Sequence, residues 1–150
     1  MALLEKISED LKIAMKSGDK IRVETLRMIR AGLLEKNVEK RPSGGMNQDD
    51  EISVLMSASK KRKESIEIFR LNGRNDLAEQ EEKELQIIQE YLPVQLSLEE
   101  IEKYVKKVIN DVGATTEKDF GKVMPVVMKE LKGKADGKII QETVRKLLGK

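Results

Sequence analysis

The sequence predicts an all-α protein, with an N-terminal helical hairpin or bundle of about four helices followed by a small three-helix C-terminal domain. Apolar residues recur at helical spacing through most of the 150 residues. Charged residues make up 37% of the chain and aromatic residues only 3%, so the core is aliphatic, which suits packed helices better than a β-sandwich. Glycine and proline fall between these periodic segments, where helices end.

The first two helices are expected before the turn-rich segment at residues 41–45. Apolar residues at helical spacing and the Ser17-Gly18 stop predict a first helix from about Leu3 to Lys16. Asp19 is placed to cap a second helix, whose apolar residues surround much of its axis. That pattern is typical of a helix packed on more than one side, so the second helix is expected to be central.

The third and fourth helices are expected between residues 47 and 92. Asn47 is a predicted cap, and the third helix should extend to Leu71. Its middle, residues 57–65, holds one small apolar residue and is therefore expected to be solvated. Asn72-Gly73 should stop this helix, and Asp76 is predicted to cap the next, which closes before a proline at position 93.

Three shorter helices are expected after Pro93. Ser97 and Glu100 match a capping box, and Gly113 provides a C-terminal stop. Thr115 or Thr116 can start the next helix.

Pro125 leaves two alternatives for that helix, because it either kinks the helix or occupies the first turn of one that begins near Val123. Gly133 should stop the helix and Asp136 should cap the last one. The buried stripe of the last helix is expected to consist of Ile139, Ile140, Val144, Leu147 and Leu148.

Charge divides the chain at the same place. We expect an N-terminal domain at residues 1–93, with 17 basic and 18 acidic side chains, and a C-terminal domain at residues 94–150, with 12 and 9. Residues 121–150 alone carry eight basic groups against three acidic ones. The net charge of +2 is therefore unevenly distributed, with a nearly neutral N-terminal part and a basic C-terminal end.

Composition excludes several classes of chemistry. The chain has no His and no Cys, so it has no thiolate nucleophile, no imidazole base and none of the usual zinc or haem ligands. Ser57 and Lys60 match the Ser-x-x-Lys pattern of penicillin-binding enzymes, but the companion motifs are missing. Gly121-Lys122 and Gly137-Lys138 lack the rest of a phosphate-binding loop. We expect no catalytic, cofactor-binding or metal-binding residues.

Two further charged runs are interpreted as solvated helix surface. They are the acidic residues at 79, 81, 82 and 84 and the basic stretch at 60–63. The N-terminus contains charged residues within two turns and no long apolar run, so neither a signal peptide nor a membrane span is expected. A cytoplasmic protein without membrane contact is the expectation.

The most informative segment is the basic junction between the last two expected helices. Lys132, Lys134 and Lys138 stand beside a predicted helix N-terminus, where phosphates of a nucleic acid backbone could bind. Gly133 and Gly137 would permit close backbone approach. Lys122 and Lys129 would widen the basic face. The alternative is an ordinary helix-turn-helix with Asp136 as its cap and lysines for solubility. Because no aromatic residues are interleaved, sequence-specific readout of single strands is not expected.

This segment resembles the C-terminal tail domain of the B subunit of the tRNA-dependent Asp/Glu amidotransferase. The matching residues are Gly121, Val123, Met124, Lys132, Gly133, Lys134, Ala135, Asp136, Ile140, Val144 and Leu147. The stretches at 24–30 (ETLRMIR) and 90–97 (EYLPVQLS) are similar to the stand-alone GatB/YqeY family, and the similarity covers essentially the whole chain.

The resemblance implies an all-helical N-terminal part, a three-helix C-terminal part and a role in binding tRNA or another structured RNA. It does not carry over chemistry, because the kinase-like domain and the amidase signature are absent. We therefore expect a non-catalytic RNA-binding accessory module. An adaptor for an amidotransferase or an aminoacyl-tRNA synthetase, and a subunit of a glutamine-dependent carbon–nitrogen ligase, stay open as alternatives.

Overall fold

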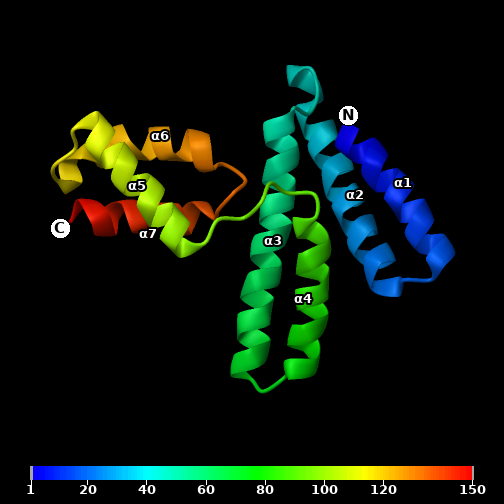
Figure 1. The fold of residues 1–150 in the computed structure, drawn as a ribbon. Coiled ribbons are helices and arrows are strands. Elements are labelled where there is room, and N and C mark those ends of the chain that lie inside the picture. Colours follow the sequence, from blue (N-terminus) through cyan, green and yellow to red (C-terminus); the bar gives the residue numbers. More distant parts are fainter. Residues whose placement is uncertain (1, 150) are drawn as a thin grey trace. The chain divides into compact units, whose positions relative to one another are not determined.

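The computed structural model describes residues 2–149, and these residues form helices and connecting turns with no strand. An all-helical protein is therefore confirmed. The chain forms two compact units, Met1–Leu92 and Pro93–Lys150, each with its own apolar core (Figure 1). The two units are described separately.

In the first unit, α1 (Ala2–Ser17) and α2 (Lys20–Lys40) pack side by side. Asp19 caps α2 by accepting a hydrogen bond from the backbone N–H of Arg22 at 3.1 Å, as the sequence predicts. A short 3₁₀ turn, η1 (Arg41–Ser43), follows α2 and ends at Gly44, whose φ is +93°. These two helices contribute Ile7, Ala14, Leu26, Ile29 and Leu33 to the core of the first unit.

An antiparallel hairpin of α3 (Gln48–Leu71) and α4 (Asn75–Gln89) completes the first unit, and both of its helices pack against α2 (Figure 1). The turn uses Gly73 at a φ of +70°. The prediction that Asp76 caps α4 is wrong, because α4 begins at Asn75 with Arg74 in the cap position. The carboxylate of Asp76 instead lies 3.3 Å from Nε of Arg74.

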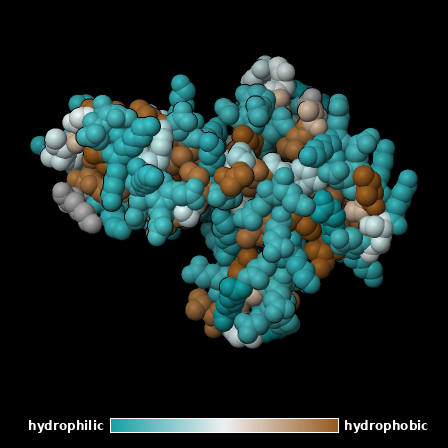
Figure 2. All heavy atoms as spheres, viewed as in Figure 1, coloured by the Kyte–Doolittle hydropathy of each residue, from teal (hydrophilic) through white to brown (hydrophobic). Residues whose placement is uncertain are grey.

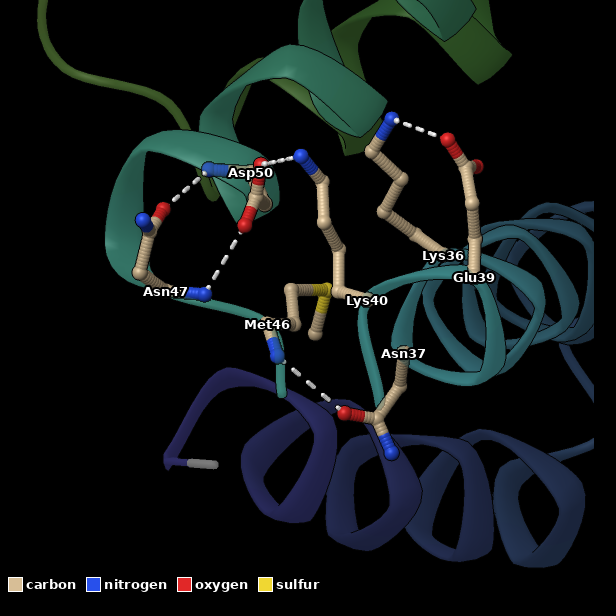
Figure 3. A network of polar contacts seen from close by, with 7 residues as sticks. All are labelled: Lys36, Asn37, Glu39, Lys40, Met46, Asn47 and Asp50. Atoms are coloured by element: carbon tan, nitrogen blue, oxygen red, sulfur yellow. Dashed lines mark hydrogen bonds and ion pairs between the residues drawn. The ribbon is translucent and has the colours of Figure 1, made fainter. Parts of the chain in front are cut away.

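Polar contacts fix the connection between α2 and α3 (Figure 3). Asn47 and Asp50 form a reciprocal capping box, with bonds of 2.9 and 3.0 Å between each side chain and the other residue's backbone N–H. Lys40 Nζ lies 3.6 Å from Asp50 Oδ1, and the side chain of Asn37 accepts a hydrogen bond from Met46 N. The hydrogen bond from Asn47 N, joined by the charge of Lys40, lowers the pKa of Asp50.

The residues after α4 are tied back to α1 and α2. Tyr91 donates a hydrogen bond of 2.5 Å to Asp10, and Arg22 forms a 2.8 Å ion pair with Glu90. Burial and the neighbouring carboxylate of Asp10 both raise the pKa of the Tyr91 phenol. Lys6 lies over the ring, 5.6 Å from its centre. The C-terminal end of the first unit is thus held by contacts from two helices.

The second unit consists of α5 (Leu98–Val112), a 3₁₀ turn η2 (Glu117–Asp119), α6 (Phe120–Leu131) and α7 (Gly137–Leu148). Each of the three α-helices packs against the other two. Ser97 and Glu100 form the expected capping box of α5, and Gly113 ends the helix at a φ of +69°. The core is aliphatic and includes Ile101, Val105, Val108, Val123, Val127, Leu131, Ile140, Val144 and Leu148.

Three expectations about α6 and α7 are corrected. Pro125 lies inside α6, which begins at Phe120, so the alternative that it occupies a first turn near Val123 is wrong. Ile139 is 39% exposed and does not belong to the buried stripe of α7. Thr116 precedes η2 rather than starting α6.

Candidate nucleic-acid interface

The turn between α6 and α7 is set by local backbone chemistry. Gly133 has a φ of +80°, a left-handed conformation that a residue with a Cβ adopts only at a cost. The N–H of Lys134 bonds to the carbonyl of Leu131 at 2.9 Å and closes the turn. Gly133 is buried, so it shapes the turn rather than offering its backbone to a ligand.

The segment before α5 anchors this turn. The side-chain amide of Gln95 donates hydrogen bonds to the carbonyl of Gly133 at 2.7 Å and to that of Pro93 at 2.8 Å. The N–H of Leu96 bonds to the carbonyl of Lys134 at 2.8 Å. The turn therefore has a fixed conformation and a fixed place relative to α5. Gln95 was missed by sequence reasoning, since its partners are 38 residues away in the chain and no local pattern shows them.

The N-terminus of α7 is occupied by its own cap. The carboxylate of Asp136 accepts a hydrogen bond of 3.0 Å from the backbone N–H of Lys138. This negative group takes the position in which an external phosphate would meet the helix N-terminus. A Cβ added to Gly137 would lie 3.8 Å from Cε of Met128, an ordinary contact, so no close approach requires glycine there. Binding of phosphate at this corner has to come from the lysine side chains.

The five candidate lysines form two groups. Lys132 and Lys138 are exposed and Lys134 is half-buried in the turn between α6 and α7. Lys122 and Lys129 are exposed on α6, seven residues apart and therefore on the same side of that helix.

One of the α6 lysines has an acidic neighbour. Lys122 Nζ lies 3.7 Å from Asp119 Oδ1. The backbone N–H groups of Thr115 and Thr116 bond to Asp119 and lower its pKa. Because this carboxylate is held by the backbone, it partly offsets the charge of Lys122.

The basic stretch in α3 does not form a uniform solvated surface. Arg62 points inward, where its Nε lies 3.3 Å from Glu81 Oε2 and 3.0 Å from Glu84 Oε2, and Ser59 is buried. The interpretation of residues 57–65 and of the acidic run in α4 as solvated is therefore wrong at these positions. Burial and the charge of Glu81 raise the pKa of Glu84, while Arg62 opposes the shift.

A groove of about 320 Å³ lies between α2 and α3, with Met28, Gly32 and Val54 among its apolar lining. Its polar residues carry both signs of charge and include Glu35, Lys36, Glu39 and Lys61. Lys36 is paired with Glu39 at 3.5 Å (Figure 3). This mixture does not favour a polyanion. The second unit, with its excess of lysines, is the better candidate interface.

Other kinds of site find no support in the described part of the chain. No hydrogen bond joins Ser57 to Lys60 among residues 2–149, and both side chains are exposed. The same residues contain no cluster of three or more acidic side chains arranged to hold a metal ion. None of their helices is both long and apolar enough to span a membrane.

Known proteins are similar to this chain over most of its sequence. A protein from Pyrenophora tritici-repentis named "Altered inheritance of mitochondria protein 41, mitochondrial" is 29% identical over 98% of this chain and 81% of its own length. Proteins of the same name from Vanderwaltozyma polyspora and Lachancea thermotolerans are 34% and 38% identical, over 71% and 57% of this chain. The matches span 58% and 46% of those two proteins, about half their length. The family described as "Yqey-like protein" matches residues 4–148, and the chain belongs to this family.

Proposed function

We propose that the protein is a non-catalytic RNA-binding accessory module, with tRNA or aminoacyl-tRNA as its ligand. The observation that carries the proposal is the fixed turn between α6 and α7, which presents Lys132, Lys134 and Lys138 within seven residues. Hydrogen bonds from Gln95 and Leu96 hold this turn, so less conformational freedom is lost on binding than in a mobile loop. Residues 94–150 would hold RNA, in the same way as the tail domain of the amidotransferase B subunit.

Salt dependence of binding tests the proposal. Each lysine–phosphate contact releases counterions and adds about 0.9 to the slope of log affinity against log salt on duplex-like RNA. The variant Lys132→Gln/Lys134→Gln/Lys138→Gln should flatten the slope by about 2.7. A matched control, Lys12→Gln/Lys16→Gln/Lys20→Gln, removes three exposed lysines of the first unit and should leave the slope unchanged. Fluorescence anisotropy with labelled tRNA gives both slopes, and equal slopes for the two variants would contradict the proposal.

A second candidate function is a protein-interaction adaptor for an amidotransferase or an aminoacyl-tRNA synthetase. It is favoured by the tip of the α3–α4 hairpin, where Leu71 is 81% exposed and Ile68 is 57% exposed. Figure 2 shows apolar side chains emerging at this tip. Under this candidate, Leu71→Ser should abolish co-purification with the partner enzyme and leave tRNA affinity unchanged. Loss of tRNA affinity in that variant would argue against a separate adaptor surface.

A cytoplasmic location is also part of the proposal. The relatives named above carry the word mitochondrial in their names, so the mitochondrion is the alternative location. Imaging of the chromosomally tagged protein in its own cells distinguishes the two.

A further inference from the structure

A small cavity on the second unit lies beside the aromatic ring of Phe120. The cavity has a volume of about 280 Å³ and is lined by Glu117, Phe120, Arg145 and Leu148. Leu148 is buried and Phe120 packs against the core, so these two side chains provide the apolar lining. Glu117 and Arg145 are both exposed and provide the charged groups. The cavity therefore combines an aromatic ring with one acceptor group and one donor group.

The two charged groups of this cavity are not paired within the described part of the chain. No ion pair or side-chain hydrogen bond among residues 2–149 involves Glu117 or Arg145, although both line the same cavity. The guanidinium of Arg145 lies over the ring of Phe120, 5.0 Å from its centre. This contact leaves the N–H groups of the guanidinium without an acceptor. Both charged groups are thus available to an external ligand.

The surroundings of Glu117 favour a ligand that donates hydrogen bonds. A Cβ added to Gly149 would lie 3.1 Å from Oε1 of Glu117, so this carboxylate lies beside the C-terminal end of α7. The last carbonyl groups of a helix carry partial negative charge, which is unfavourable for a neighbouring carboxylate. An N–H donor bound to Glu117 would offset this repulsion.

The charges of the cavity disfavour two kinds of ligand. A cationic ligand would meet Arg145, which already occupies the position over the ring. An anionic ligand that approached Arg145 would also meet Glu117 and the C-terminal end of α7. A neutral planar ring with donors and acceptors on its edges can satisfy both charged groups. Such a ring can also stack on an aromatic side chain or on a guanidinium, as unpaired RNA bases do.

Guanine fits this arrangement better than the other three RNA bases. Its N1–H and N2–H donors lie side by side and match the two oxygens of a carboxylate, and its O6 and N7 accept hydrogen bonds from arginine. Adenine has an acceptor at N1, so it loses one of the two bonds to the carboxylate. Uracil and cytosine each offer a carboxylate only one donor group. The N1–H of guanine is accessible only when the base is unpaired.

We infer that this cavity binds one unpaired guanine base, with Glu117 accepting from its donor edge and Phe120 and Arg145 holding its ring. The inference rests on the proposed function, because it takes an RNA as the source of the base and names a feature of that RNA. A single cavity reads one base, so it agrees with the expectation that the protein does not read a run of single-stranded bases. A free guanine nucleotide carries the same base, and the experiment separates the two sources.

Two short RNAs that differ in one base test the inference. The pentaribonucleotides UUGUU and UUAUU carry the same charge, so their phosphate contacts cancel in the comparison. Fluorescence anisotropy at low salt gives the ratio of their dissociation constants for the wild type and for Glu117→Gln. The matched control is Glu99→Gln, which removes an exposed carboxylate of α5 in the same unit. Circular dichroism checks that each variant keeps its helical content.

The wild type should bind UUGUU about tenfold more tightly than UUAUU. This is toward the low end of what a bidentate base contact provides, because Glu117 is exposed. Glu117→Gln should bring the ratio close to one, since an amide offers one acceptor and one donor in place of two acceptors. Glu99→Gln should keep the ratio of the wild type. Phe120→Leu should weaken binding of both RNAs about fivefold through loss of stacking.

A second measurement uses free nucleotides. NMR titrations with GMP and AMP follow the backbone amides at 117–120 and 145–148. GMP should shift these amides at lower concentration than AMP, and Glu117→Gln should remove the difference. Equal titrations with GMP and AMP, or a ratio of the two RNAs that Glu117→Gln leaves unchanged, would overturn the inference.

The inference and the proposed function fail in different ways. The guanine site is refuted, and the proposed function stands, if the wild type does not distinguish the two RNAs while Lys132→Gln/Lys134→Gln/Lys138→Gln still flattens the tRNA slope. If the chain shows no salt-dependent tRNA binding but prefers GMP to AMP through Glu117, the proposed function is refuted. RNA as the source of the guanine is then refuted with it, in favour of a free nucleotide.

Discussion

Replacement of Arg62 by Met should destabilise the first unit strongly. Nε of Arg62 lies 3.0 and 3.3 Å from carboxylate oxygens of Glu84 and Glu81. The side chain of Arg62 is 18% exposed, that of Glu84 is 13% exposed and that of Glu81 is 21% exposed. Methionine keeps the helix and the apolar stem but leaves two carboxylates close together, away from most of the solvent, without a cation.

The magnitude follows from the buried ion pairs. Breaking a buried pair by removing one partner costs about 3–5 kcal/mol, and the residual exposure of these groups places the cost near 3 kcal/mol. With a denaturant slope of about 1.5 kcal/mol per M, the urea midpoint of the first unit should fall by about 2 M. Lys60→Met, at an exposed position two residues earlier, is the matched control and should change the midpoint little.

The loss of stability caused by Arg62→Met should depend on pH. The pKa of Glu84 is already raised in the folded protein, so the folded state holds its proton to higher pH than the unfolded chain. Stability from this group is therefore greatest at low pH and falls as pH rises through the folded pKa. Loss of Arg62 raises the pKa further, because the opposing charge is gone. The deficit of Arg62→Met should be larger at pH 8 than at pH 5.

Urea unfolding followed by circular dichroism measures this deficit, and hydrogen exchange of peptides from 48–92 and 98–148 assigns it to a unit. Neutralising the carboxylates as well, in Arg62→Met/Glu81→Gln/Glu84→Gln, should recover most of the loss. A deficit no larger than that of Lys60→Met, or the same deficit at both pH values, would refute the reasoning.

Three further predictions concern the turn and the end of the first unit. Gly133→Ala forces a Cβ into the left-handed region and should cost about 1–2 kcal/mol, seen as a melting temperature of the second unit lower by about 5–10 °C. Asp136→Ala should cost about 1 kcal/mol in urea unfolding, through loss of the α7 cap, without weakening RNA binding, since it removes a negative charge. Tyr91→Phe should cost about 1–2 kcal/mol at pH 8 through its bond to Asp10. Because the folded state raises the pKa of this phenol, that contribution is present below about pH 10 and declines above it, so the Tyr91→Phe deficit in urea unfolding should shrink at pH 11.

Helix ends were predictable because caps depend on a few neighbouring residues. Asp19, Asn47, Ser97 and Asp136 accept hydrogen bonds from backbone N–H groups two or three residues ahead, so the required chemistry is visible in the sequence. Asp76 is the exception, since it lies inside the first turn of α4, and its carboxylate pairs with Arg74, which holds the cap position. A local signal fails where a nearby side chain competes for the same group.

Burial of polar side chains was not predictable from one segment. Arg62 sits in a stretch that looks solvated, and its partners Glu81 and Glu84 lie on the next helix. Only the packing of α3 on α4 brings the three together. The same holds at the candidate interface, where the lysines of the turn were visible in the sequence but their support by Gln95 was not.

The most direct test of RNA binding by the second unit is an NMR titration of the ¹⁵N-labelled 150-residue chain with tRNA. Binding at the turn predicts saturable shifts of the backbone amides at 132–138, with the amides of α1 to α4 unchanged. Shifts confined to residues 2–92, or no saturable shifts at 132–138, would contradict it.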